Sequence, residues 1–192
     1  LNTGQVDLGS YKHFMQKEIF EQPQAIRDTL ESRITNDSVV VSTFGNNAEE
    51  IFTQVKQVQI IACGSSYNAG VVAKYWLEDI AKISCNIEVA SEYRYRHPIL
   101  LNETLFITLS QSGETADTVE ALKTAKDINS NINTLCITNS SESSLTRLSD
   151  LVFLTHAGPE IGVASTKAFT TQLVALALLT CSIGKFKNSI DI

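Results

Sequence analysis

The sequence predicts an α/β protein in which helices cover both faces of a five-stranded parallel sheet, a three-layer α/β/α sandwich. Short apolar runs alternate with segments of helical spacing between residues 58 and 187, which is typical of parallel strands joined by crossover helices. The runs are largely apolar throughout, as expected of strands that are buried on both faces. With 43% hydrophobic and 19% charged residues among 192, the chain is long and apolar enough to bury a substantial core.

The first part of the chain is predicted to be a helical lead-in or linker over residues 1–46, ahead of the α/β domain at 47–192. Residues 1–12 have no periodic pattern, and we expect them to be disordered or draped over the surface. The segment 13–34 has helical spacing, but Pro23 predicts two short helices, the second beginning near the proline. A helix interior uses the N–H that proline lacks, whereas the first turn has no need of it.

The α/β domain is expected to begin with a short helix over 47–56, because Asn46 and Asn47 precede Glu49 in a pattern typical of a helix N-terminus. The crossovers that join parallel strands should be right-handed. Strands are predicted at 58–63, 84–90, 104–109, 133–138 and 151–155, and helices at 67–81, 115–128, 143–149 and 166–187.

Charge and hydropathy argue against nucleic acid and membrane as partners. The formal net charge is −6, and no run of Lys and Arg provides the basic face that nucleic-acid binding needs. The longest apolar run, 173–183, is shorter than the ~20 residues that span a bilayer, and we find no signal peptide. We therefore expect a cytoplasmic protein. The chain begins at Leu1 rather than methionine, so we expect it to be a piece of a larger protein.

The cysteines and histidines indicate neither a disulfide framework nor a metal site. The four cysteines lie in or beside apolar runs and none has C-x-x-C spacing, which favours buried free thiols. They are Cys63, Cys85, Cys136 and Cys181. The three histidines are far apart in sequence. We expect no metal and no cofactor.

Two polar junctions that follow predicted strands resemble one another. One is 63–68 (CGSSYN), after the strand at 58–63, and the other is 110–115 (SQSGET), after the strand at 104–109. Both combine one glycine with two serines where a helix begins. In an open parallel sheet, ligands bind beyond the carboxyl ends of the strands, beside helix N-termini. These junctions are therefore the first places to look for a ligand.

An anion such as a phosphate suits a junction of this kind. The first turn of a helix has unpaired N–H groups and about half a positive charge, and a glycine lets the backbone approach an anion closely. The hydroxyls of Ser110, Ser112 and Thr115 can each donate a hydrogen bond, worth roughly 1.5–3 kcal/mol to a charged group. The alternative is that these residues only cap the helix, since Ser and Thr are favoured there in any case.

A third junction, 160–172 (EIGVASTKAFTTQ), joins the last strand to the last helix. Its backbone groups and hydroxyls suit contacts to a sugar, although Thr166 is more simply an N-cap and Lys167 a solvated charge. Proton transfer between neighbouring sugar carbons needs a carboxylate that titrates near neutral pH. Three glutamates near junctions are candidates, each more simply a surface or capping carboxylate: Glu92, Glu114 and Glu160.

Four segments together resemble one family: 15–23 (MQKEIFEQP), 62–68 (ACGSSYN), 109–115 (LSQSGET) and 160–172 (EIGVASTKAFTTQ). The motif at 109–115 is similar to that of sugar isomerase (SIS) domains, whose fold is flavodoxin-like or Rossmann-like. The first and last segments narrow the resemblance to the isomerase half of the glucosamine-6-phosphate synthase family, the isomerising glutamine:fructose-6-phosphate aminotransferases. The resemblance covers about residues 11–187.

The resemblance implies roles for particular residues toward a hexose phosphate, either fructose 6-phosphate or glucosamine 6-phosphate. The group at 110–115 would bind the phosphate, Ser66 would contact the sugar, and the third junction would line the same pocket. Ser65 stands where many relatives have threonine, a change that keeps the hydroxyl. The implied substrate-binding residues are Ser65, Ser66, Ser110, Gln111, Ser112, Thr115, Val163 and Ser165.

The resemblance also implies what this chain lacks. In the family, a glutaminase domain precedes two SIS domains, and the catalytic groups come from the second SIS domain or a neighbouring subunit. This chain resembles the linker and the first SIS domain, so we expect no catalytic residue in it and no activity from it in isolation. The implied partners are the glutaminase domain, the second SIS domain and a second copy in a homodimer.

Two other functions are weaker alternatives. SIS domains also serve as phosphosugar sensors attached to helix-turn-helix regulators, but the segments 15–23 and 160–172 favour the synthase family. A nucleotide-binding doubly wound domain would need a glycine fingerprint, and 64–70 (GSSYNAG) does not match G-x-G-x-x-G.

Overall fold

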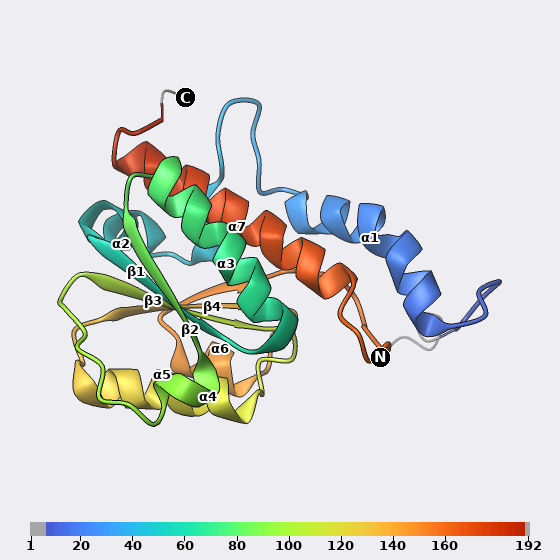
Figure 1. Ribbon diagram of the computed structural model, residues 1–192. Helices are drawn as coiled ribbons and strands as arrows, with labels where there is room; N and C mark the ends of the chain where they lie inside the picture. The colour runs from blue at the N-terminus through green and yellow to red at the C-terminus, as the bar shows by residue number, and fades with distance from the viewer. Residues whose placement is uncertain (1–6, 191–192) are drawn as a thin grey trace.

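The computed structural model describes residues 7–190, and a five-stranded parallel sheet lies at its centre (Figure 1). The helices before the sheet are α1 (Phe14–Leu30), the 3₁₀ turn η2 (Val41–Phe44) and α2 (Ala48–Gln54). The strands are β1 (Gln57–Ala62), β2 (Ser84–Val89), β3 (Thr104–Ser110), β4 (Asn133–Thr138) and β5 (Leu151–Leu154). The connecting helices are α3 (Gly64–Asp79), α4 (Ala90–Tyr93), α5 (Ala116–Ile128), α6 (Ser144–Leu148) and α7 (Lys167–Phe186).

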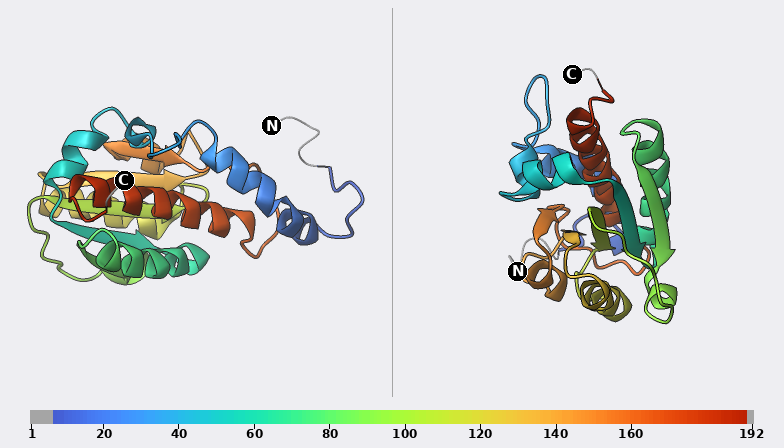
Figure 2. Two further views of the ribbon diagram at one scale, coloured as in Figure 1. Left: turned by 90° about the horizontal axis from the view of Figure 1, so that it is seen from above. Right: turned by 90° about the vertical axis from the view of Figure 1, so that its left-hand side faces the viewer.

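The strands lie in the order β2-β1-β3-β4-β5, and every neighbouring pair is parallel. Helices α3 and α7 cover one face of the sheet, and α4, α5 and α6 cover the other (Figures 1 and 2). The predicted three-layer sandwich with five parallel strands is therefore confirmed. The chain order reverses between β1 and β3, which is the place where doubly wound sheets bind their ligands.

The core consists of two apolar layers, one on each face of the sheet. Ile60 and Ile107 face the layer of α3 and α7, whereas their neighbours Ile61 and Phe106 face the layer of α4, α5 and α6. All four side chains are fully buried. A strand buried on both faces needs apolar residues at successive positions, which explains why the strands were recognisable as apolar runs.

Helix α1 is continuous through Pro23, so the prediction of two short helices is wrong. A proline at position 23 has no N–H to donate to the carbonyl of Ile19, four residues earlier. The side chain of Gln22 satisfies that carbonyl instead, because its Nε2 donates to the Ile19 oxygen at 2.9 Å. This local replacement of the missing hydrogen bond lets the helix continue.

The lead-in helix packs against this domain. In both figures α1 lies beside the N-terminal half of α7. The end of α1 and the residues that follow it are attached to the end of β5: Thr29 Oγ1 donates to the Thr155 carbonyl at 2.6 Å, and Arg33, just beyond the helix, donates to the Leu154 carbonyl at 2.5 Å. Further along, Phe44 is fully buried in the core, with its ring 5.4 Å from the Phe52 ring and 4.9 Å from the Phe153 ring.

Helix α7 is long and apolar enough to cross a membrane when length and composition alone are considered. It extends beyond the apolar run 173–183 on which the sequence prediction was based. In the structure 56% of its most apolar window is buried, against α1, α3 and the sheet. Burial between layers accounts for its composition, as in the core helices of many globular proteins.

The structure also contains short elements that the sequence pattern did not predict. They are η2 and α4, each of four residues, which are too short to show a helical period. Helix α3 begins at Gly64, three residues before the predicted start, so the first polar junction is itself the first turn of the helix.

The four cysteines are free thiols, as predicted, but they differ in exposure. Burial raises the pKa of Cys85 and of Cys136 to about 12. Cys63 and Cys181 are only partly buried.

At pH 8 we expect a disulfide reagent such as Ellman's to label Cys63 and Cys181 in the folded protein, and Cys85 and Cys136 only after unfolding. The thiolate is the reactive form, and a pKa of about 12 leaves almost none of it at pH 8. Rapid labelling of all four thiols without denaturant would contradict this assignment.

Replacing Phe153 with alanine should lower the free energy of unfolding by about 3–5 kcal/mol, measured by urea denaturation. The ring is fully buried, lies 4.9 Å from the Phe44 ring and has the Arg33 guanidinium 4.1 Å from its centroid. The matched control is Tyr95→Ala, whose ring is 78% exposed and should change stability by less than about 0.5 kcal/mol. A similar small loss in both variants would contradict this description of the core.

Candidate functional site

A cavity of about 510 Å³ opens at the carboxyl ends of β1 and β3, where the strand order reverses. The two strands are paired with Ala62 opposite Leu109, so α3 and α5 begin beside one another. The loop between β5 and α7 closes the third side. The lining residues are Cys63, Gly64, Ser65, Ser66, Leu109, Ser110, Gln111, Ser112, Thr115, Glu160, Gly162, Val163, Ala164 and Ser165.

All eight residues that the sequence resemblance implies for substrate binding line this cavity. Three separate segments supply them. Ser65 and Ser66 come from the first turn of α3, and Val163 and Ser165 from the β5–α7 loop. The remaining four come from the end of β3 and the turn into α5: Ser110, Gln111, Ser112 and Thr115.

The first turn of α3 presents its backbone to the cavity. Gly64 has φ +57°, a left-handed conformation that favours glycine, and a Cβ built on it would meet no atom within 4 Å. The N-cap position, Cys63, makes no side-chain capping bond. The N–H groups of this turn are therefore left to water or a ligand, together with the partial positive charge of the helix N-terminus.

In the turn before α5, two of the hydroxyls hold the turn itself. Ser110 is 3% exposed, and its Oγ accepts from Gly113 N at 3.1 Å and lies 2.9 Å from Thr115 Oγ1. Ser112 is exposed, and its Oγ accepts from Glu114 N at 3.2 Å. The N-cap residue Thr115 makes no side-chain bond to the first turn of α5. The capping alternative thus explains the shape of the turn but not the first-turn N–H groups of α5.

The same turn is supported from behind by the β4–α6 segment. Gly113 has φ +67°, and a Cβ there would lie 2.1 Å from Ser143 Oγ, so only glycine fits. The Gln111 carbonyl accepts from Asn139 N at 3.1 Å and from Thr138 Oγ1 at 3.3 Å. These contacts fix the turn that carries the candidate anion ligands.

Of the three glutamates considered for proton transfer, Glu160 caps a helix and Glu92 lies outside the cavity. Glu160 Oε1 caps α7, since it accepts from Thr166 N at 2.9 Å, from Thr166 Oγ1 at 3.1 Å and from Ala168 N at 3.1 Å. Glu92 is exposed on α4 and does not line the cavity. Thr166 occupies the N-cap position of α7, as the sequence indicated, but its side chain makes no capping bond and Glu160 satisfies the N–H groups instead.

The hydrogen bonds and the pKa of Glu114 do not suit a role in proton transfer. Its carboxylate accepts from Ser144 Oγ at 2.7 Å and from Ser144 N at 2.6 Å. These two hydrogen bonds, with the nearby Arg147, hold the pKa of Glu114 below its usual value. A general base for sugar chemistry needs a pKa nearer neutrality, so this carboxylate is better described as a cap on α6.

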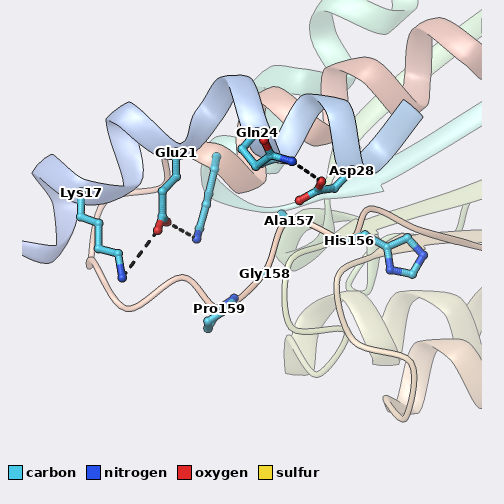
Figure 3. A pocket seen from close by; sticks show the side chains of 10 residues that line it. Lys17, Glu21, Gln24, Asp28, His156, Ala157, Gly158 and Pro159 are labelled. Atoms are coloured by element: carbon cyan, nitrogen blue, oxygen red, sulfur yellow. Dashed lines mark hydrogen bonds and ion pairs between the residues drawn. The ribbon is translucent and has the colours of Figure 1, made fainter. Parts of the chain in front are cut away.

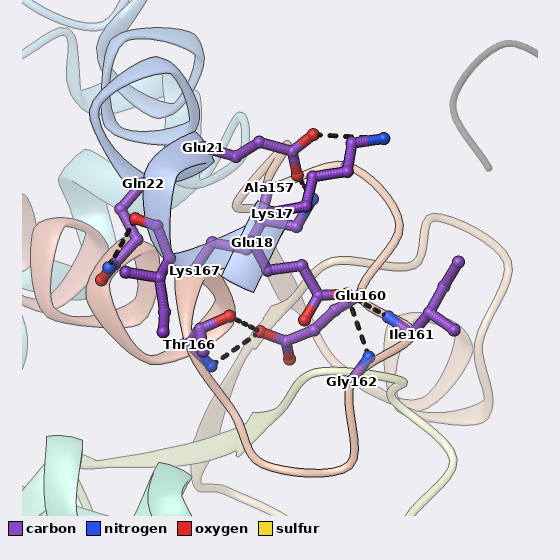
Figure 4. A network of polar contacts seen from close by, with 12 residues as sticks. Lys17, Glu18, Glu21, Gln22, Ala157, Glu160, Ile161, Gly162, Thr166 and Lys167 are labelled. Atoms are coloured by element: carbon purple, nitrogen blue, oxygen red, sulfur yellow. Dashed lines mark hydrogen bonds and ion pairs between the residues drawn. The ribbon is translucent and has the colours of Figure 1, made fainter. Parts of the chain in front are cut away.

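Lys167 is not the solvated charge that the sequence predicted. It is 4% exposed, and its Nζ lies 2.7 Å from Glu21 Oε2 on α1 (Figure 4). Glu18, one turn earlier, reaches the β5–α7 loop, where its Oε1 accepts from Ile161 N and Gly162 N. The sequence pattern gave no sign of either contact, because more than 140 residues separate the partners.

A second, smaller cavity of about 300 Å³ lies where α1 crosses the segment after β5 (Figure 3). Lys17, Glu21 and Lys167 line it together with Asp28 and the exposed His156. Its charges are of both signs and pair with one another, Lys17 with Glu21 at 3.6 Å and Lys167 with Glu21 at 2.7 Å. The lining is therefore better explained as the interface that attaches α1.

Comparison with known proteins places the chain in a family. The model of the SIS domain matches residues 51–182. The chain is 57% identical over 185 residues to the glutamine–fructose-6-phosphate aminotransferase (isomerizing) of Pseudomonas syringae pv. tomato, an alignment that covers 96% of this chain and 30% of that protein. The protein of the same name from Haemophilus influenzae is 52% identical over 192 residues, covering 100% of this chain and 31% of the relative.

A solved structure is also similar. The C-terminal domain of glucosamine-fructose-6-phosphate aminotransferase from Francisella tularensis superposes with a TM-score of 0.92 at 50% identity, covering 97% of this chain and 52% of that one. The chain thus spans about 30% of the length of the aminotransferases that it matches. The resemblance seen in the sequence is confirmed, and the chain belongs to the SIS domain family.

Proposed function

We propose that this chain is the first SIS domain of an isomerising glutamine–fructose-6-phosphate aminotransferase, and that it binds the phosphate of the hexose phosphate in the 510 Å³ cavity. The parent enzyme would make glucosamine 6-phosphate from fructose 6-phosphate and glutamine. The similarity to aminotransferases over 96% of the chain supports the proposal that the parent protein is such an enzyme. Its coverage of 30% of their length supports the presence of further domains as partners, and the homodimer remains part of the same proposal.

One observation carries the phosphate assignment. Two helices, α3 and α5, begin at one cavity without a side-chain cap, and hydroxyls surround them. Within residues 7–190 the lining contains no Lys, Arg or His, so the attraction for an anion would come from the helix N-termini and the hydroxyl donors. A net charge of −6 is compatible with this kind of local attraction.

The geometry favours an anchoring role over a catalytic one. Glu160 is the carboxylate that lines the cavity, and its Oε1 is engaged in capping α7. Binding energy at the phosphate, remote from the reacting carbons, would orient the sugar toward catalytic groups supplied by another domain. The β5–α7 loop, with Val163 and Ser165, would lie along the sugar.

The double variant Ser112→Ala/Thr115→Ala in the full-length enzyme should raise KM for fructose 6-phosphate at least ~100-fold. Each hydroxyl donates to a charged group, which is worth roughly 1.5–3 kcal/mol. Steady-state kinetics measure the effect. The matched control is Ser130→Ala, an exposed serine beyond the other end of α5, which should leave KM unchanged. An unchanged KM in the double variant would count against the phosphate assignment.

The isolated chain should bind fructose 6-phosphate weakly and should not convert it to glucose 6-phosphate. An NMR titration should show shifts confined to residues 64–68, 110–115 and 163–166, because each of these segments contains residues that line the cavity. A coupled assay for glucose 6-phosphate measures turnover. Clear conversion of fructose 6-phosphate by the chain alone would contradict a role limited to anchoring the substrate.

A further inference from the structure

We propose that Glu18, on α1, is a positioning residue that holds the 160–165 loop in the shape that the hexose phosphate needs. The inference rests on the proposed function, because it concerns the same cavity. Glu18 does not line that cavity and would act through the loop that does. Helix α1 would then contribute to substrate binding through this loop.

The loop has little of its own to fix its shape. Residues 160–165 have no regular secondary structure, and the Val163 side chain at the tip is fully exposed. Glu160 attaches the loop to α7 through the bonds described above. The middle of the loop is held by Glu18 Oε1, which accepts from Ile161 N at 2.6 Å and from Gly162 N at 3.0 Å (Figure 4).

Burying the Glu18 side chain in this environment disfavours folding, which argues that the residue has a role other than stabilising the fold. The side chain is 2% exposed, and its Oε2 is buried without a hydrogen-bond partner among the described residues. A buried polar atom that lacks a partner disfavours the folded state, and a buried carboxylate does so more strongly than a neutral group. A position whose only task was to pack α1 against its neighbours would be better filled by an apolar side chain.

Gly162 shows independently that the loop is fitted against this part of α1. A Cβ at position 162 would lie 2.6 Å from Glu18 Oε2 and 3.4 Å from Met15 Cα. The loop backbone therefore approaches α1 too closely for any side chain while Glu18 keeps its place. The carboxylate and the glycine form one contact, from which the cavity-lining residues Val163 and Ser165 continue.

Helix α1 has other attachments, so Glu18 can be tested without releasing the helix. Glu21 pairs with Lys167 and Thr29 donates to the Thr155 carbonyl, and just beyond the helix Arg33 donates to the Leu154 carbonyl. Loss of the Glu18 carboxylate should therefore free the middle of the loop and leave α1 on α7.

The experiment compares Glu18→Ala, Glu18→Gln and the control Glu31→Gln in the full-length protein that carries this chain. Glu31 is exposed at the C-terminal end of α1, so its variant removes the same charge away from the loop.

Calorimetry gives Kd for fructose 6-phosphate, and hydrogen exchange gives the protection of amides in 157–166. For the alanine variant we expect Kd to rise ~10-fold or more, since small displacements of positioning groups are costly, with faster exchange in this segment. Glutamine keeps an acceptor oxygen and should restore both to within ~3-fold, and the control should match the parent.

The outcomes separate the two proposals. If the parent protein does not bind fructose 6-phosphate, the proposed function fails and the positioning role fails with it. If the parent binds but Glu18→Ala leaves Kd unchanged, only the positioning role is overturned, whether or not exchange in the loop becomes faster. Faster exchange throughout α1 and α7 would show a general structural role and would also overturn it.

A second variant keeps the test decisive if Glu18→Ala does not fold. Gly162→Ala should displace the Glu18 carboxylate and raise Kd for fructose 6-phosphate in the same direction. Where Glu18→Ala does fold, the 2.6 Å contact no longer exists in the double variant Glu18→Ala/Gly162→Ala, so the two effects should combine to less than their product. An unchanged Kd in Gly162→Ala, or fully independent effects in the double variant, would contradict the proposed contact.

Discussion

The in-register parallel pairing of β1 with β3 is the constraint on which the rest of the site depends. Because Ala62 lies opposite Leu109, the two strands end at the same level. The chain order reverses between them, so α3 and α5 leave toward opposite faces of the sheet (Figure 1). The space between two helix N-termini then stays open, and both partial positive charges act on it.

Among the described residues, carboxylates accept hydrogen bonds from N–H groups on the β5–α7 side of this cavity and not from the starts of α3 and α5. Helix α7 begins with its N–H groups engaged by Glu160, and the loop before it gives two N–H groups to Glu18. Helices α3 and α5 begin without such side chains. An anion in the cavity would therefore find free donors on the β1 and β3 side and satisfied donors on the β5–α7 side, which favours phosphate at the former and neutral sugar hydroxyls at the latter.

Much of the fold was visible in the sequence because its signals are local. Continuous apolar runs identified the five strands, and the glycine and serines at 64–66 and 110–113 marked the two junctions that lead into α3 and α5, although α3 begins three residues before its predicted start. Other local rules failed where a neighbouring side chain changed the outcome. Pro23 does not end its helix, because Gln22 satisfies the carbonyl of Ile19. Thr166 is the N-cap residue of α7, but Glu160, six residues earlier, accepts the hydrogen bonds that its side chain does not make.

The sequence by itself determined the strand and helix order, the candidate residues for anion binding and the family resemblance, since each of these is contained within a short segment. Only the tertiary structure decided that three segments separated by up to 100 residues meet at one cavity. It also decided that Lys167 is a buried partner of Glu21 and that Glu18 holds the loop at 160–165. Such contacts depend on how α1 packs against α7, and a charged side chain has no pattern along the chain that reveals which distant backbone group it will meet.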